Sequence, residues 1–154
     1  MIITGDAFRF IVTDQLKACG VTALDILIEP AGRNTAPAAI AAALHLAAGD
    51  KLMLYRMRQT DGRHYSSGKW FARDGSATLL GTSDIVMTPR ALTEIEGRKI
   101  PTAWHIAIPG LAFAVDCAPL NAKSWMGTSF PYWEGPISFG GSHSGLGYLE
   151  MTGY

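Results

Sequence analysis

The chain has 154 residues, and its 13 Lys and Arg balance its 13 Asp and Glu, so the formal net charge is zero. Hydrophobic residues make up 48% of the chain and charged residues only 17%, which excludes an intrinsically disordered chain and the basic surface that nucleic-acid binding needs. The sequence contains no apolar run near the roughly 20 residues of a membrane span, and two cysteines, Cys19 and Cys117, are too few for a disulfide scaffold, which favours a cytoplasmic location.

The composition changes near Asp50. All four Trp and all five Tyr follow this residue, whereas alanine dominates before it. We therefore expect two parts with different packing, residues 1–49 and residues 50–154.

The first part is predicted to alternate strands and helices. Short apolar runs at 2–4 and 26–28 are typical of strands in a parallel sheet. Apolar residues at helical spacing predict a helix over 8–19, and Gly20 stops it. The apolar stretch 38–48 predicts a second, buried helix. The expected order over residues 1–49 is β-α-β-α.

The second part is predicted to be an antiparallel β domain. The pairs Asp61-Gly62 and Asp74-Gly75 are hairpin-turn signals between alternating apolar segments. The expected strands are 52–58, 64–72, 84–88, 102–108, 111–117, 132–139 and 146–152. Their spacing of about ten residues is typical of a sandwich or barrel. The predicted fold class is therefore α+β, mainly antiparallel β.

The first part resembles a family through two sequence segments. "FRFIVTDQL" at 8–16 and "ILIEPAGRNTAPA" at 26–38 closely resemble an internal stretch of the mannose-1-phosphate guanylyltransferases. The resemblance implies a Rossmann-like nucleotidyltransferase fragment in which Glu29, Arg33 and Asn34 are vestigial nucleotide-binding residues near the guanine of GTP. The family's phosphate loop, G-x-G-T-R-L-x-P, and its metal-binding P-S-D-H segment are absent from this sequence. Phosphoryl transfer then lacks charge stabilisation, so a structural role for this part is favoured over guanylyltransferase activity.

The second part resembles a different family. The segments "KLMLYRMR", "IPTAWHIAIP", "YWEGPISFGG" and "GLGYLEMTGY" resemble the C-terminal half of the carotenoid 1,2-hydratase (hydroxyneurosporene synthase) family. The resemblance implies a lipocalin-like barrel or sandwich over 50–154 that binds a small hydrophobic or isoprenoid ligand. It also implies hydratase chemistry, a carbon–oxygen lyase activity, if the domain is active, although truncation favours an inactive one. We expect a chimera that joins two truncated parents at Gly49-Asp50; the alternative is a recombinant chain without native activity.

Hydration of an isolated C=C bond needs a general acid and a wall that tolerates a carbocation, and aromatic faces can supply the wall. Glu134 and Tyr132 are the candidate catalytic residues, because alternation along a strand lets them share one face while Trp133 points the other way. The candidate ligand-binding residues are Trp104, Trp133, His105 and Glu150. Trp104 and His105 are likewise expected to point to opposite sides.

Each candidate also has a purely structural interpretation. Tyr132 and Trp133 suit core packing, and Glu134 suits the backbone N–H groups of a bend beside Gly135-Pro136. Glu150 is expected to pair with Arg56 or Arg58 across the sheet, and His105 to be a hydrogen-bonded core histidine.

Several other functions are not expected. "GSHSG" at 141–145 has His143 where a nucleophile elbow has Ser, so we reject that motif. The four histidines lack metal-ligand spacing, and neither a metal nor a cofactor is expected. Cys117 is expected to be inert core. Half of a paired β assembly leaves strand edges uncovered, so a homo-oligomer through those edges is a further expectation.

Overall fold

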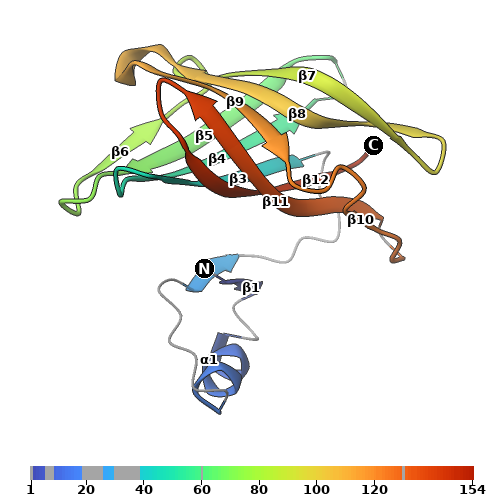
Figure 1. The fold of residues 1–154 in the computed structure, drawn as a ribbon, viewed down its shortest axis with the longest axis horizontal. Helices are drawn as coiled ribbons and strands as arrows, with labels where there is room; N and C mark the ends of the chain where they lie inside the picture. The colour runs from blue at the N-terminus through green and yellow to red at the C-terminus, as the bar shows by residue number, and fades with distance from the viewer. Residues whose placement is uncertain (1, 6–8, 19–25, 30–38, 60, 130) are drawn as a thin grey trace. The chain divides into compact units, whose positions relative to one another are not determined.

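The structure, a computed structural model, describes residues 2–5, 9–18, 26–29, 39–59, 61–129 and 131–154. The chain divides into two compact units, residues 1–35 and 36–154. The small unit contains β1 (Ile2–Gly5), α1 (Arg9–Ala18) and β2 (Ile26–Glu29). β1 and β2 pair in parallel (Figure 1). These three elements lie where the sequence predicts strand, helix and strand.

The large unit is one ten-stranded sheet, and all strand pairings between its described residues are antiparallel. The strands are β3 (Ala39–Leu46), β4 (Lys51–Arg58), β5 (His64–Phe71), β6 (Ala77–Leu80), β7 (Val86–Ile95), β8 (Arg98–Ile108), β9 (Phe113–Pro119), β10 (Trp125–Met126), β11 (Tyr132–Gly141) and β12 (Gly145–Thr152). A short 3₁₀ helix, η2 (Pro109–Leu111), connects β8 to β9. Seven of these strands match the seven predicted ones, and the mainly antiparallel β fold is confirmed.

The predicted helix over 38–48 is wrong. Residues 39–46 form β3, a central strand that pairs with β4 on one side and β12 on the other. Ala43 faces Met53 on β4 and Tyr148 on β12. A short, continuous apolar run suits a buried helix or a central strand equally well, and here two neighbouring strands supply the backbone partners. The predicted β-α-β-α segment is thus β-α-β followed by the first strand of the large sheet.

The predicted junction at Gly49-Asp50 lies in the β3–β4 hairpin. Gly49 has a φ of +101°, a left-handed conformation that suits glycine in a tight turn. The Asp50 carboxylate accepts hydrogen bonds from Trp70 Nε1 at 3.1 Å and from the backbone N of Arg73 at 3.0 Å. The sheet therefore continues across this position.

The strand order is β6-β5-β4-β3-β12-β11-β9-β8-β7, with β10 attached to β11. The sheet curls into a half-barrel in which β7, β8 and β9 lie over β3, β4 and β5 (Figure 1). The ring of Trp70 on β5 contacts that of Phe113 on β9, with centroids 5.5 Å apart, although four strands separate β5 from β9 in the sheet order.

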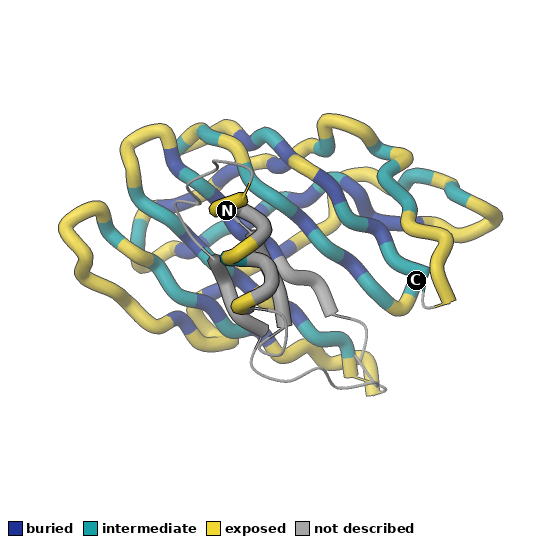
Figure 2. The backbone as a smooth tube through the Cα atoms, turned by 90° about the horizontal axis from the view of Figure 1, so that it is seen from below, coloured by how far each residue is buried: buried dark blue, intermediate teal, exposed yellow. Residues whose placement is uncertain are grey.

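Alternation along the strands gives the half-barrel two faces. The inner face carries the core, which includes Leu52 and Leu54 of β4, Trp104 of β8 and Trp133 of β11. Buried and less buried residues alternate along most strands, as Figure 2 shows. We call the opposite side of the sheet the outer face. Within the described residues, no helix has the length and apolar character needed to cross a membrane.

Candidate functional site

The two predicted catalytic residues lie together on the outer face. Tyr132 and Glu134 belong to β11, and the register places Glu134 opposite Glu150 of β12. Tyr148 of β12 lies opposite Pro136 on the same face. All four side chains are partly buried. We call Tyr132, Glu134, Tyr148 and Glu150 the outer-face cluster.

Glu134 is at the centre of this cluster. The hydroxyl groups of Tyr132 and Tyr148 both hydrogen-bond to its carboxylate. Burial, then the hydrogen bond to Glu134 and its negative charge, raise the pKa of Tyr148 to about 12. Burial and the charge of Glu134 also raise the pKa of Tyr132. Both phenols therefore keep their protons at neutral pH and act as hydrogen-bond donors to the carboxylate.

Tyr148 was not among the residues predicted from the sequence. The available signal was its spacing of two residues from Glu150, which places both side chains on one face of β12. What the sequence does not contain is the register between β11 and β12 that brings Tyr148 to Glu134.

The two candidate tryptophans lie on the inner face. Trp133 is 0% exposed and Trp104 is 1% exposed. Trp133 Nε1 donates to the backbone oxygen of Ala122 at 2.9 Å, and Trp104 Nε1 donates to that of Pro101 at 2.6 Å. The prediction that Trp133 points away from Tyr132 and Glu134 is confirmed. Because the sheet separates them, these indoles do not adjoin the outer-face cluster.

His105 lies on the outer face of β8, opposite to Trp104 as predicted. Its Nδ1 is 2.8 Å from Asp116 Oδ1 on β9, and Arg90 Nε lies 3.4 Å from the same oxygen. The hydrogen bond with His105 is the largest cause that lowers the pKa of Asp116. His105 is hydrogen-bonded as expected, but it is not a core residue. Asp116 faces Gly140 on β11, six residues along the strand from Glu134, so His105 is not part of the outer-face cluster.

The expected pairing of Glu150 with an arginine of β4 is wrong. Arg56 and Arg58 share the inner face with Leu52 and Leu54, whereas Glu150 lies on the outer face. Residues one apart on a strand point to opposite sides, and the register aligns Glu150 with Ala41, the neighbour of Tyr55 rather than of Arg56.

Both arginines instead contact aromatic rings on the inner side. The Arg56 guanidinium carbon is 5.3 Å from the centre of the Trp104 ring, and that of Arg58 is 4.0 Å from the centre of the Tyr154 ring. From the sequence alone, these arginines were expected only as partners of Glu150, and Tyr154 was not a candidate.

The remaining sequence candidates have these positions. Glu29 is the last residue of β2, and Arg33 and Asn34 lie outside the described residues. The "GSHSG" segment connects β11 to β12 in a hairpin, not a strand to a helix, which agrees with rejection of the nucleophile elbow. Cys117 is 3% exposed in the core, and burial raises its pKa to about 12. Among the described residues, no three His, Cys, Asp or Glu side chains are grouped to hold a metal ion.

Comparison with known proteins finds two separate similarities in this chain, one to a protein family and one to curated enzymes. Residues 41–154 match the family model described as AttH-like. The chain is also 44% identical over 54 residues to the mannose-1-phosphate guanylyltransferase of Salmonella montevideo, and 45% identical over 58 residues to that of Escherichia coli K12. Each of these two matches covers 35% of this chain and 12% of the relative. The chain thus spans about an eighth of the length of the curated relatives it matches.

Two solved structures share the fold. One is AttH from Nitrosomonas europaea, with a TM-score of 0.71 and 20% identity, covering 81% of this chain and 41% of that one. The other is kievitone hydratase from Nectria haematococca, with a TM-score of 0.63 and 18% identity, covering 77% of this chain and 41% of that one.

Proposed function

The chain belongs to the AttH-like family, and from this premise we propose that its large unit binds a small hydrophobic ligand of the isoprenoid class. We propose in addition that an active form adds water across a C=C bond. The name of kievitone hydratase, whose fold this unit shares, supports a hydratase-like lipocalin domain. A shared fold does not by itself fix a function, so the outer-face cluster is the feature that supports this proposal.

The observation that carries the proposal is one carboxylate held by two tyrosine hydroxyls on a sheet face that also exposes apolar side chains. On the strands around Glu134, Tyr55 of β4 is 41% exposed and Leu146 of β12 is 61% exposed. An apolar ligand that covers these side chains removes their surface from water, worth roughly 25 cal/mol per Å². Glu134 would then lie beside a ligand from which water is partly excluded.

In the proposed reaction, the protonated carboxyl group of Glu134 transfers its O–H proton to one alkene carbon, and the carboxylate that remains accepts hydrogen bonds from Tyr132 and Tyr148. A water molecule attacks the carbocation at the other carbon, and its surplus proton returns to the Glu134 carboxylate. Tyr132 and Tyr148 orient the carboxyl group through their hydrogen bonds. The atoms balance, since one water adds to one C=C bond and the acid is regenerated.

The test follows incorporation of oxygen from ¹⁸O-labelled water into a linear terpene alkene, with ligand binding measured separately by calorimetry. We expect Glu134→Gln to abolish incorporation while binding is retained, and Tyr148→Phe to slow it. Glu94→Gln, at an exposed position of β7, is the matched control. Equal incorporation by the wild type and Glu134→Gln would refute the acid role. Binding without incorporation by the wild type would leave a ligand-binding module, and neither binding nor incorporation would favour the alternative of a recombinant chain without native activity.

For the N-terminal part, we propose a guanylyltransferase-derived fragment joined to the β domain, with no nucleotidyl transfer. The 44% identity over only 12% of the Salmonella montevideo enzyme supports a fragment. Saturation-transfer NMR with GTP should detect no contact at Glu29 or Arg33. A transfer signal at either residue would contradict the vestigial assignment.

A homo-oligomer through strand edges also stays a proposal. The path of the described sheet ends at β6 and β7, and these edge strands expose Leu79 and Leu92. Unpaired backbone groups on such strands can pair with another chain. Light scattering that gives only a monomer would refute it.

A further inference from the structure

Among the described residues, the inner face carries a buried arginine with no carboxylate partner. Arg56 is only 9% exposed, although its neighbours on the same face of β4 are core leucines. Within the described part of the chain, no Asp or Glu oxygen lies within 4.0 Å of the Arg56 guanidinium. Its contact is the face of Trp104, which is itself fixed by the hydrogen bond to Pro101.

More positive charge surrounds this position. Arg58 lies two residues further along the same face, and its buried Nε has no hydrogen-bond partner in the part of the chain that the structure describes. Arg58 Nη2 donates to the backbone oxygen of Gly153 at 2.5 Å, and Arg98 Nη1 donates to that of Tyr154 at 2.6 Å. His64 is directly opposite Arg58 in the β4–β5 register.

The electrostatic coupling of these groups is consistent with one site. Burial, followed by the charges of Arg56 and Arg58, lowers the pKa of His64. Burial lowers the pKa of Arg56, Tyr154 beside it raises this pKa, and the charge of Arg58 lowers it. Burial and the charge of Arg58 disfavour the positive form, and an anion placed among these groups would act in the same direction as Tyr154.

A guanidinium has five N–H donors, and burial of an ion without a partner costs free energy that an oxyanion can offset. We propose that Arg56, with Arg58 and Tyr154, forms an anion-binding site on the inner face for the carboxylate of a small, otherwise apolar molecule. This site is separate from the outer-face cluster, and it does not depend on the hydratase proposal.

The chemical class follows from the surroundings. A planar guanidinium binds a carboxylate through two parallel hydrogen bonds, so Arg56 suits this head group. Trp104 and Met151 are core residues on the same side of the sheet, each 1% exposed, and the partly exposed ring of Tyr154 lies beside Arg58. The Tyr154 ring suits an aliphatic or aromatic tail better than a second charged group.

Decanoate is the probe, and decanol is its uncharged counterpart of equal chain length. Binding to the full chain is measured by calorimetry and by the fluorescence of the buried tryptophans. We expect the wild type to bind decanoate at least about tenfold more tightly than decanol or acetate, because only decanoate supplies both the charge-assisted hydrogen bonds and the apolar tail. Equal affinity for decanoate and decanol would overturn the anion site, and equal affinity for decanoate and acetate would overturn the apolar tail.

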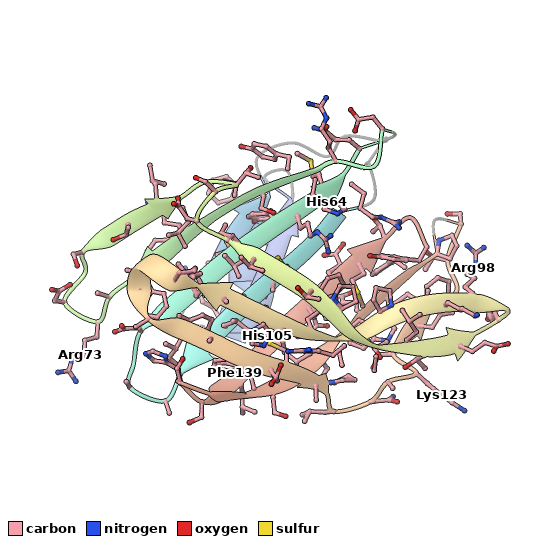
Figure 3. All side chains as sticks on the ribbon, turned by 90° about the horizontal axis from the view of Figure 1, so that it is seen from above. His64, Arg73, Arg98, His105, Lys123 and Phe139 are labelled. Atoms are coloured by element: carbon pink, nitrogen blue, oxygen red, sulfur yellow. The ribbon has the colours of Figure 1, made fainter. Side chains whose placement is uncertain are left out.

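Arg56→Met removes the charge and keeps an unbranched side chain. We expect it to lower decanoate affinity about tenfold or more, with decanol affinity unchanged. Arg73→Met is the control, since Arg73 is exposed and Figure 3 shows it far from His64 and Arg98. Unchanged decanoate affinity in Arg56→Met would overturn the assignment. Since the ligand comparison uses the wild type, it decides the proposal even if the variant does not fold.

Discussion

Substitution of Arg56 by methionine also predicts a change in the stability of the ligand-free protein. If the Arg56 guanidinium binds a ligand, the ligand-free protein carries a buried charge that does not stabilise its fold. Removal of this charge should then stabilise the protein. If Arg56 instead supports the core through its contact with Trp104, its removal should destabilise the protein.

The expected magnitude follows from the burial of Arg56. Arg56 as a whole residue is 9% exposed, and an ion buried without a carboxylate partner costs about 3 kcal/mol. The cation–π contact with Trp104 offsets about 2 kcal/mol of that cost. Methionine retains the apolar packing of the arginine stem. We therefore expect Arg56→Met to raise the free energy of unfolding by about 1 kcal/mol and Tm by about 2–6 °C.

The assay is urea and thermal unfolding of the ligand-free chain, followed by far-ultraviolet circular dichroism. Arg73→Met should change the free energy of unfolding by less than about 0.5 kcal/mol, as is usual for exposed positions. A loss of more than about 1 kcal/mol in Arg56→Met, beyond the change in the control, would refute the reasoning. It would show that the empty fold depends on the guanidinium.

Three further predictions concern other positions. In a Cys19→Ser background, Cys117 should react with a thiol reagent at pH 8 only after unfolding, because burial raises its pKa to about 12; rapid reaction in the folded state would contradict its burial. Gly68→Ala should destabilise the sheet by about 1–3 kcal/mol in urea unfolding, since the new Cβ would lie 2.8 Å from the backbone oxygen of Met53; unchanged stability would contradict this close packing. The lowered pKa of His64 favours its neutral form in the folded state, so its contribution to stability is present above the unfolded pKa of about 6.5 and is lost as pH falls below it. Urea titrations at pH 7.5 and 5.0 should therefore show a smaller loss of unfolding free energy in His64→Gln than in the wild type. An equal loss in both proteins would refute the linkage.

Local sequence patterns predicted most of the large sheet. Alternation and turn residues located seven strands, and the hairpin glycines Gly62 and Gly75 do adopt positive φ values of +82° and +88°. The short strands β6 and β10 were missed, because two to four residues carry too little periodicity to detect. β3 was assigned to a helix, because its alanine-rich run has no period that separates a central strand from a buried helix.

The candidate site was predictable only within single strands. Alternation correctly separated Tyr132 and Glu134 from Trp133, since residues one apart on a strand point to opposite sides. Alternation along β4 and along β12 does not predict which side chains of one strand lie on the same face of the sheet as those of the other. For that reason Glu150 was paired with the arginines of β4, although they lie on opposite faces of the sheet.

The sequence by itself therefore determined the class of the large unit, the extent of most strands and the relative direction of neighbouring side chains. These properties depend on contacts between residues close in the chain. The tertiary structure alone decided that residues 39–46 join the sheet, that Tyr148 reaches Glu134 and that Arg56 lies over Trp104. The physical reason is that strand order, register and curl arise from hydrogen bonds and packing between residues far apart in the chain.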